Sequence, residues 1–277
     1  MPARLITNTH GKHSVRVSKI RREADRHDFV EMSVDIELIG DFDASYTEAD
    51  NRSVVATDTC RNTIYMLANR SPMADPESFA LEIAEHFVRQ YDHVHSAIAQ
   101  VHETVWERLP GSDHAFAGNR SDRRTARAIA TGHGPTALLA GVKDFVIAKT
   151  TQSGFANFHR DEYRTLADTD DRILATSMTA LWSFNQTPAA PGSLRPTIMD
   201  ALLTAFVDHY SHSVQETLMR MGTAVLDACQ DLRDIELTMP NKHHIPFNFE
   251  PLGEANTNEV FVVTDEPFGY IQATVGR

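Results

Sequence analysis

Residues 30 to 38 show the clearest pattern in the chain, a strict alternation of apolar and polar side chains. A period of two places every apolar group on one face, which is typical of a β-strand with one buried side. Val15 and Val17 show the same alternation, and the polar segment 21–27 between the two stretches predicts a hairpin. The apolar positions of the longer stretch are Val30, Met32, Val34, Ile36 and Leu38.

A helical pattern begins at Asp75-Pro76-Glu77, which combines a capping residue, a first-turn proline and an early acid. Apolar residues then recur every four positions and form one buried stripe. Two further strands are predicted to follow, over residues 95–109 and 115–130. The stripe of the helix consists of Phe79, Ile83, Phe87 and Tyr91.

The second half repeats this order of patterns without a close sequence repeat. Its predicted strands are 142–150, 173–184, 235–239 and 271–275, and its predicted helices are 197–210 and 214–232. With a helix after residue 57 in the first half, each half has the order strand-strand-helix-helix-strand-strand. This order predicts two domains, residues 1–135 and 136–277.

Strands with one apolar face and helices with one apolar stripe pack as helices on one side of an antiparallel sheet, which is an α+β fold. The other face of such a sheet is polar or lines a cavity, and its free edges must be paired, covered or closed into a barrel. We therefore expect the chain to form an oligomer.

The composition is that of a soluble globular protein with a substantial core: 277 residues, of which 42% are hydrophobic and 23% charged. No apolar run approaches the roughly 20 residues of a membrane helix, and no secretory signal opens the chain. Cys60 and Cys229 form neither a disulfide framework nor a zinc motif. The net charge of −12 disfavours a general nucleic-acid binder, so an anionic ligand needs a local basic or amide-lined pocket.

Thr57 and Asp58 form the first candidate site, because they follow the short apolar run 54–56 and open a predicted helix. The free N–H groups and the dipole of a helix N-terminus favour an anion. Alternatively, Thr57 or Asp58 only caps the helix.

Ser213-Val-Gln-Glu216 forms the second candidate, a capping box in which Ser213 bonds forward and Glu216 bonds back. Val214 and Gln215 then lie in the first turn, where their N–H groups point outward. The amide of Gln215 both donates and accepts, which suits the edge of a purine-like ring. A solvated glutamine on a common capping box is the alternative.

Two further candidates lie beside predicted strands. Arg172 precedes one strand, and its planar fork suits a two-point grip on an anionic heterocycle, or else a surface ion pair with Asp168 or Asp171. The polar segment Pro240–His244 ends another strand. The fourteen histidines match no zinc signature, and the chain has no P-loop, no dinucleotide-binding fingerprint and no nucleophile elbow.

These segments, in this order, resemble the urate oxidase (uricase) family over nearly the whole chain. The matching motifs are Val55–Thr63, Arg160–Tyr163 with Asp171–Leu174, Ser213–Gln215 and Pro240–His243. The resemblance implies the tunnel fold, or T-fold, in which two tandem halves each carry two helices on a four-stranded antiparallel sheet. It also implies that two subunits close one β-barrel and that two barrels stack into a homotetramer, with active sites at subunit interfaces.

The resemblance implies the reaction and its binding residues as well. Phe155 stacks on the flat urate ring, Arg172 and Gln215 hold it by two-point hydrogen bonding, and the Val214 N–H assists. Molecular oxygen and water convert urate into 5-hydroxyisourate and hydrogen peroxide. No metal or organic cofactor is implied, because deprotonated urate is electron-rich enough to pass an electron to oxygen itself.

The resemblance further implies that Thr57 and the backbone of Asp58, from the neighbouring subunit, meet the opposite edge of urate. Lys12 and Thr57 form the family's proton-transfer pair, and His243 extends the relay. Asn241 holds oxygen, or the water that later attacks, above the ring.

Two positions depart from the family pattern: His10 stands where tyrosine is usual, and Arg61 where lysine is common. The chain ends at Arg277 without the peroxisomal Ser-Lys-Leu signal of eukaryotic relatives, so we expect a cytoplasmic enzyme. One alternative is a zinc-dependent tunnel-fold enzyme acting on pterins or GTP, which would need a His/Cys ligand set that the sequence lacks. The other is a non-catalytic tetramer of the same family, against which the intact set of site residues argues.

Overall fold

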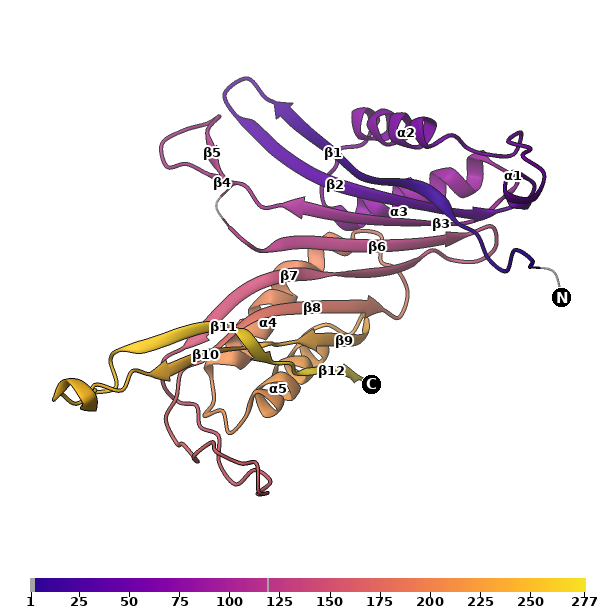
Figure 1. Cartoon of the computed structure of the whole chain (residues 1–277). Helices are drawn as coiled ribbons and strands as arrows, with labels where there is room; N and C mark the ends of the chain where they lie inside the picture. Colours follow the sequence, from indigo (N-terminus) through magenta and orange to yellow (C-terminus); the bar gives the residue numbers. More distant parts are fainter. Residues whose placement is uncertain (1–2, 119) are drawn as a thin grey trace. The chain divides into compact units, whose positions relative to one another are not determined.

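The computed structural model describes residues 3–118 and 120–277 and has an α+β architecture (Figure 1). The chain forms two compact units. One comprises Met1–Gly141 with Ser183–Ser193, and the other comprises Val142–Trp182 with Leu194–Arg277. The α+β class predicted from periodicity is confirmed.

The first unit has an antiparallel sheet in the order β1-β2-β3-β6, with helices that pack on it. The predicted hairpin is confirmed, since β1 and β2 are joined by residues 23–26. The alternation in β2 buries Met32, Val34, Ile36 and Leu38 completely, which contributes about 1.5–3 kcal/mol for each side chain. The elements are β1 (His10–Arg22), β2 (His27–Gly40), α1 (Asp43–Thr47), α2 (Thr57–Arg70), α3 (Pro76–Gln90), β3 (Val94–Thr104) and β6 (Arg123–Thr131).

Helix α3 begins where the sequence predicts. The carboxylate of Asp75 caps it by accepting a hydrogen bond from the Ser78 N–H at 2.7 Å, and Pro76 occupies the first turn. Its stripe of Phe79, Ile83 and Phe87 is fully buried against β3 and β6. The apolar period of four is therefore the side of the helix that builds the core.

The prediction of two long strands over 95–109 and 115–130 is wrong for residues 105–109 and 115–122. β3 stops at Thr104 and β6 starts at Arg123, and between them β4 (Glu107–Arg108) pairs only with β5 (Phe116–Ala117) in a separate small ladder. Pro110 and Gly111 break the strand, with Gly111 at φ +73°. The Arg108 guanidinium donates to the backbone carbonyls of His27 and Asp113 and holds the turn.

The second unit has antiparallel strands and two helices, α4 and α5, that pack on each other. β8 pairs with β10, which pairs with β11, and β8 also pairs with β9, which pairs with β12. The elements are β7 (Ala137–Lys149), whose first residues belong to the first unit, β8 (Leu174–Phe184), η1 (Pro191–Leu194), α4 (Arg195–Val207), α5 (Val214–Ala228), β9 (Leu232–Thr238), β10 (Asn241–Pro246), η2 (Glu250–Leu252), β11 (Phe261–Gly269) and β12 (Gln272–Gly276).

Helix α5 buries Leu218, Met221 and Val225, as its pattern predicts, but it ends at Ala228 instead of residue 232 because Leu232 already belongs to β9. The polar segment 240–244 is also placed differently from the prediction. It does not end the preceding strand: β9 stops at Thr238, and Asn241 begins a new strand that forms a hairpin with β11. Of the helices in the described residues, none has the length and apolarity to cross a membrane.

Candidate active site

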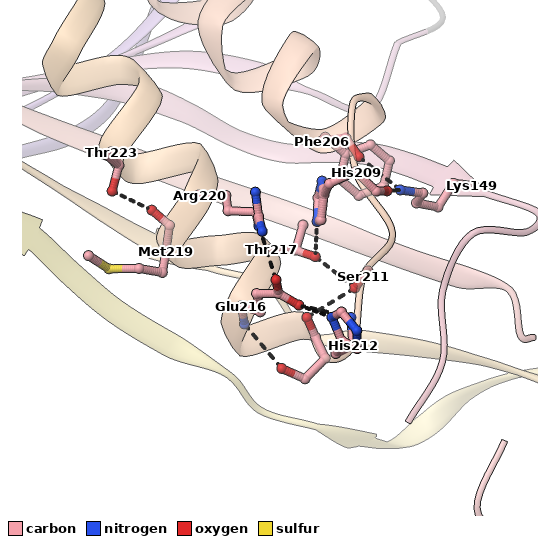
Figure 2. Close-up of polar contacts among 11 residues, drawn as sticks. Lys149, Phe206, His209, Ser211, His212, Glu216, Thr217, Met219, Arg220 and Thr223 are labelled. Atoms are coloured by element: carbon pink, nitrogen blue, oxygen red, sulfur yellow. Dashed lines mark hydrogen bonds and ion pairs between the residues drawn. The ribbon is translucent and has the colours of Figure 1, made fainter. Parts of the chain in front are cut away.

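The start of α5 is a capping box, as the sequence predicts. The Ser213 hydroxyl accepts a hydrogen bond from the Glu216 N–H at 3.1 Å. Glu216 folds back one residue further than expected, and its carboxylate accepts from the backbone N–H of His212 at 3.0 Å (Figure 2). That backbone hydrogen bond, with help from the His212 ring and Arg220, lowers the pKa of Glu216 to about 2. The box leaves the first-turn N–H groups of Val214 and Gln215 pointing out of the helix.

A cavity of about 440 Å³ lies at this helix start, within the range of small-molecule sites. Six of the residues predicted from the sequence line it together, although they come from separate segments of the second unit. They are Phe155, Arg172, Val214, Gln215, Asn241 and His243.

Backbone hydrogen bonds fix Phe155 and Arg172 on one wall of the cavity. Phe155 exchanges two with Thr169, at 2.7 and 3.0 Å, and the Arg172 N–H donates to the Ser153 carbonyl at 2.8 Å. The Arg172 guanidinium lies 5.3 Å from the centroid of the Phe155 ring. Phe158, which does not line the cavity, stacks on Phe155 at 4.7 Å with an interplanar angle of 9°. The wall therefore combines a cation with a supported aromatic ring.

Two buried polar atoms at the cavity lack a hydrogen-bond partner within residues 3–118 and 120–277: Arg172 Nε and Asn241 Oδ1. An unpaired buried polar atom costs about 1–3 kcal/mol, so at the lining of a cavity such atoms are positions where a ligand or an ordered water can supply the partner. Burial also lowers the pKa of Arg172, but a guanidinium remains cationic at any physiological pH. Asn241 is coupled to His243 by a contact of 3.2 Å between Nδ2 and Nδ1. The cavity thus suits a flat anionic ligand with both donors and acceptors.

Thr57 and Asp58 lie in the first unit, at the start of α2. The capping interpretation is wrong, because Ala56 is the N-cap residue and no side chain caps the helix. The Asp58 carboxylate pairs with Arg61 at 2.5 Å and with the Asn62 amide at 2.9 Å. Both Thr57 and Asp58 are exposed, and their backbone N–H groups precede the first intrahelical hydrogen bond, which Cys60 makes. The anion-binding interpretation therefore remains.

Lys12 lies on β1, in the same unit, beside an irregularity of the strand. The pairing register shifts between Lys12 and Val15, and Ser14 adopts φ 57°. A Cβ atom on Gly11 would lie 1.8 Å from the Ile36 carbonyl oxygen, so only glycine fits next to Lys12. Burial raises the pKa of the Cys60 thiol to about 11, and the nearby charge of Lys12 acts against this rise. Lys12 is therefore close to the first turns of α2.

The two departures from the family pattern have local partners in the first unit. His10 Nε2 contacts the Val55 carbonyl at 3.1 Å, and its ring meets the Phe42 ring edge-on at 4.3 Å. Arg61 pairs with Asp58, as described above. In the described part of the chain, no three His, Cys, Asp or Glu side chains gather into a group that could hold a metal ion.

Sequence reasoning missed much of the cavity's apolar lining. These residues come mainly from the β10–β11 hairpin, whose β11 strand shows no alternation of burial and contains Pro267. The sequence signal for Ile245 and Pro246 is that they directly follow His243-His244, and Ile173 and Ile271 open the predicted strands 173–184 and 271–275. The missed residues include Ile173, Ile245, Pro246, Phe261 and Ile271.

A cation, an aromatic face and outward N–H groups around one cavity define a protein that binds a small, flat, anionic molecule. Comparison with known proteins narrows this class. A profile of the uricase family matches residues 8–129 and 138–272, and the chain belongs to the uricase family.

Relatives of known identity agree over nearly their whole length. A uricase from Arthrobacter globiformis is 38% identical over 270 residues, covering 98% of this chain and 89% of the relative. A uricase from Danio rerio is 34% identical, covering 98% of this chain and 94% of the relative.

Solved structures show the same fold. The crystal structure of the Arthrobacter globiformis uricase superposes with a TM-score of 0.95 at 37% identity, over 100% of this chain and 96% of that chain. A uricase from Bacillus fastidious, at 23% identity, shares the fold with a TM-score of 0.86, over 98% of this chain and 94% of that chain.

Proposed function

We propose that this chain is a urate oxidase. Urate, molecular oxygen and water are converted into 5-hydroxyisourate and hydrogen peroxide, with no metal or organic cofactor. The observation that carries the proposal is the convergence of six predicted residues on one cavity in which Arg172 Nε and Asn241 Oδ1 have no partner among the residues that the structure describes.

Urate binds against the wall formed by Phe155 and Arg172. The ring stacks on Phe155, and Arg172 with Gln215 grips one edge through two-point hydrogen bonds, assisted by the outward N–H of Val214. Urate carbonyls and ring nitrogens then satisfy the unpaired guanidinium atom. A ring that lacks the matching carbonyls leaves buried donors unpaired at about 1–3 kcal/mol each, which gives selectivity.

Asn241 and His243 act above the ring. Asn241 holds oxygen, or the water that later attacks, and its contact with His243 connects it to the proton relay. The bound urate anion supplies the electrons for oxygen, so the protein binds, orients and moves protons. Neither residue needs to be a nucleophile.

Lys12 and Thr57 supply the proton transfer, and Thr57 with the Asp58 N–H meets the second edge of urate. The cavity is lined by residues of the second unit, and none of these three is among them. We place them at the cavity of a second copy of the chain. In this assembly the tandem T-fold halves 1–135 and 136–277 close a barrel between two subunits, and two barrels form a homotetramer.

The test is an assay on assembled protein treated with a chelator and checked for bound metal. We expect urate to disappear, with oxygen consumed and hydrogen peroxide formed in equal amounts. A chelated, assembled protein that leaves urate unchanged contradicts the proposal. If activity instead returns with zinc on a pterin or on GTP, the zinc-dependent alternative is correct.

A further inference from the structure

The backbone of Ser211 joins the Phe155–Arg172 wall of the cavity to the start of α5. Its N–H donates to the Gln152 carbonyl at 2.9 Å, and its carbonyl accepts from the Gly154 N–H at 2.8 Å. The segment 152–154, which Ser211 binds, continues directly into Phe155. Its Ser153 carbonyl also accepts the hydrogen bond from the Arg172 N–H. Three residues after Ser211, α5 begins with Val214. Arg172 and Gln215, which are proposed to grip urate, form the two halves of a substrate clamp. The distance between these two residues therefore depends on where Ser211 is held.

A chain of side-chain hydrogen bonds holds Ser211 (Figure 2). The Thr217 hydroxyl donates to the Ser211 hydroxyl at 2.7 Å, and the Ser211 hydroxyl donates to the Ser213 carbonyl at 3.0 Å. His209 Nε2 meets the Thr217 hydroxyl at 2.9 Å. Ser211 and Thr217 are both fully buried, so water does not compete for these bonds.

The donors and acceptors in this series of side-chain hydrogen bonds can be assigned in one direction only. Because the Thr217 hydroxyl donates to Ser211, it accepts from His209, which must carry its proton on Nε2. Burial lowers the pKa of His209 and the nearby charge of Lys149 lowers it further, while a hydrogen bond with the Ala205 backbone acts in the opposite direction. Lys149 also donates to the His209 carbonyl at 2.6 Å and to the Phe206 carbonyl at 3.2 Å. The end of α4 is thereby tied to the first turns of α5.

We propose that His209, Thr217 and Ser211 are positioning residues that set the geometry of the substrate clamp. They touch no substrate. They act through the ladder that joins the Phe155–Arg172 wall to the first turn of α5. The inference rests on the proposed function, since it concerns binding of urate at the same cavity.

Thr217→Val tests it, because valine keeps the shape of threonine and removes the hydroxyl. The dissociation constant of urate is measured without oxygen, so that urate binds and does not react. We expect Thr217→Val to raise it by about tenfold or more, since the Ser211 hydroxyl and His209 Nε2 each lose the Thr217 hydroxyl as a partner. Thr217→Ser, which keeps the hydroxyl, restores binding to within about threefold of the parent. Ser211→Ala gives a second, smaller perturbation if Thr217→Val does not fold.

Thr223→Val is the matched control, because Thr223 lies on the same helix, is exposed, and donates its hydroxyl to the Met219 carbonyl at 2.9 Å, within its own helix. We expect it to bind urate as the parent does. A purely structural role lowers the thermal midpoint of the variants but leaves the dissociation constant of the folded protein unchanged, and that result overturns the inference. A parent chain that fails to bind urate overturns the proposed function and this inference with it. Normal urate binding by the parent and by both Thr217→Val and Ser211→Ala overturns the inference alone.

Discussion

Arg172 and Phe155 meet on one wall of the cavity, with the guanidinium carbon 5.3 Å from the centroid of the ring. The pair combines the cation that an anionic ring needs with the flat apolar face that a ring stacks on. The backbone of both residues is held by the same short ladder of residues 153–155 and 169–172. A substitution at either residue is therefore expected to change binding with little effect on the fold.

Arg172→Lys is predicted to raise the KM for urate by about tenfold or more, because lysine keeps the charge but loses the two-point fork. Steady-state kinetics with urate checks this. Arg233→Lys is the control, since Arg233 is exposed and pairs with Asp234 at 2.8 Å, and the residues that line the cavity include neither of them. An unchanged KM for Arg172→Lys would rule out the two-point grip.

Lys12→Met and Thr57→Ala are each predicted to lower kcat by about a hundredfold to ten-thousandfold, because each removes one member of the proposed proton-transfer pair. Binding of urate without oxygen should change little, since Arg172, Gln215 and Phe155 remain. His13→Asn serves as the control: His13 follows Lys12 on β1, and its ring is exposed beside Glu37. Near-normal kcat in both test variants would show that the proton relay is assigned wrongly.

Glu216→Gln is predicted to remove a pH-dependent part of the stability. The folded-state pKa is lowered from 4.5 to about 2, so the contribution of the carboxylate is complete above about pH 4.5 and is lost as the pH falls towards 2. Denaturant unfolding is measured at several pH values between about 4.5 and 2. The free energy of unfolding should fall more for the parent than for Glu216→Gln over this range. Glu254→Gln, at an exposed loop position, should lose as much as the parent. Parallel curves for parent and Glu216→Gln would contradict the role of this carboxylate.

The periodicity of apolar residues predicted the strands and helices that bury one face and expose the other. β2 and α3 follow their patterns because the core accepts only their apolar side. The β10–β11 hairpin was missed because Val262 and Val263 are both exposed, so burial imposes no alternation on that strand. The break at Pro110-Gly111 was underestimated because the apolar residues around it continue the pattern on both sides.

Six residues that line the cavity were predicted individually, but their arrangement and much of the apolar lining were not. Thr57 has a side chain able to cap, yet it is the first residue of the helix and Ala56 takes the N-cap position, a backbone choice that residue types do not reveal. Phe155 and Gln215 are brought to one cavity by the bridge between Ser153 and Ser211, which joins segments far apart in the sequence. No periodic pattern encodes such a contact. The family resemblance supplied the roles of these residues.

In the proposed urate oxidase, the cavity of one chain is completed by Lys12 and Thr57 of a second copy. Lys12→Met and Arg172→Gln, each inactive alone, test it when they are co-expressed in one assembly. A mixed pair of subunits contains one cavity with both native residues, so we predict recovery of roughly a quarter of the parent's urate oxidation. If each chain builds its own complete site, mixing restores nothing, and that result would contradict the shared cavity.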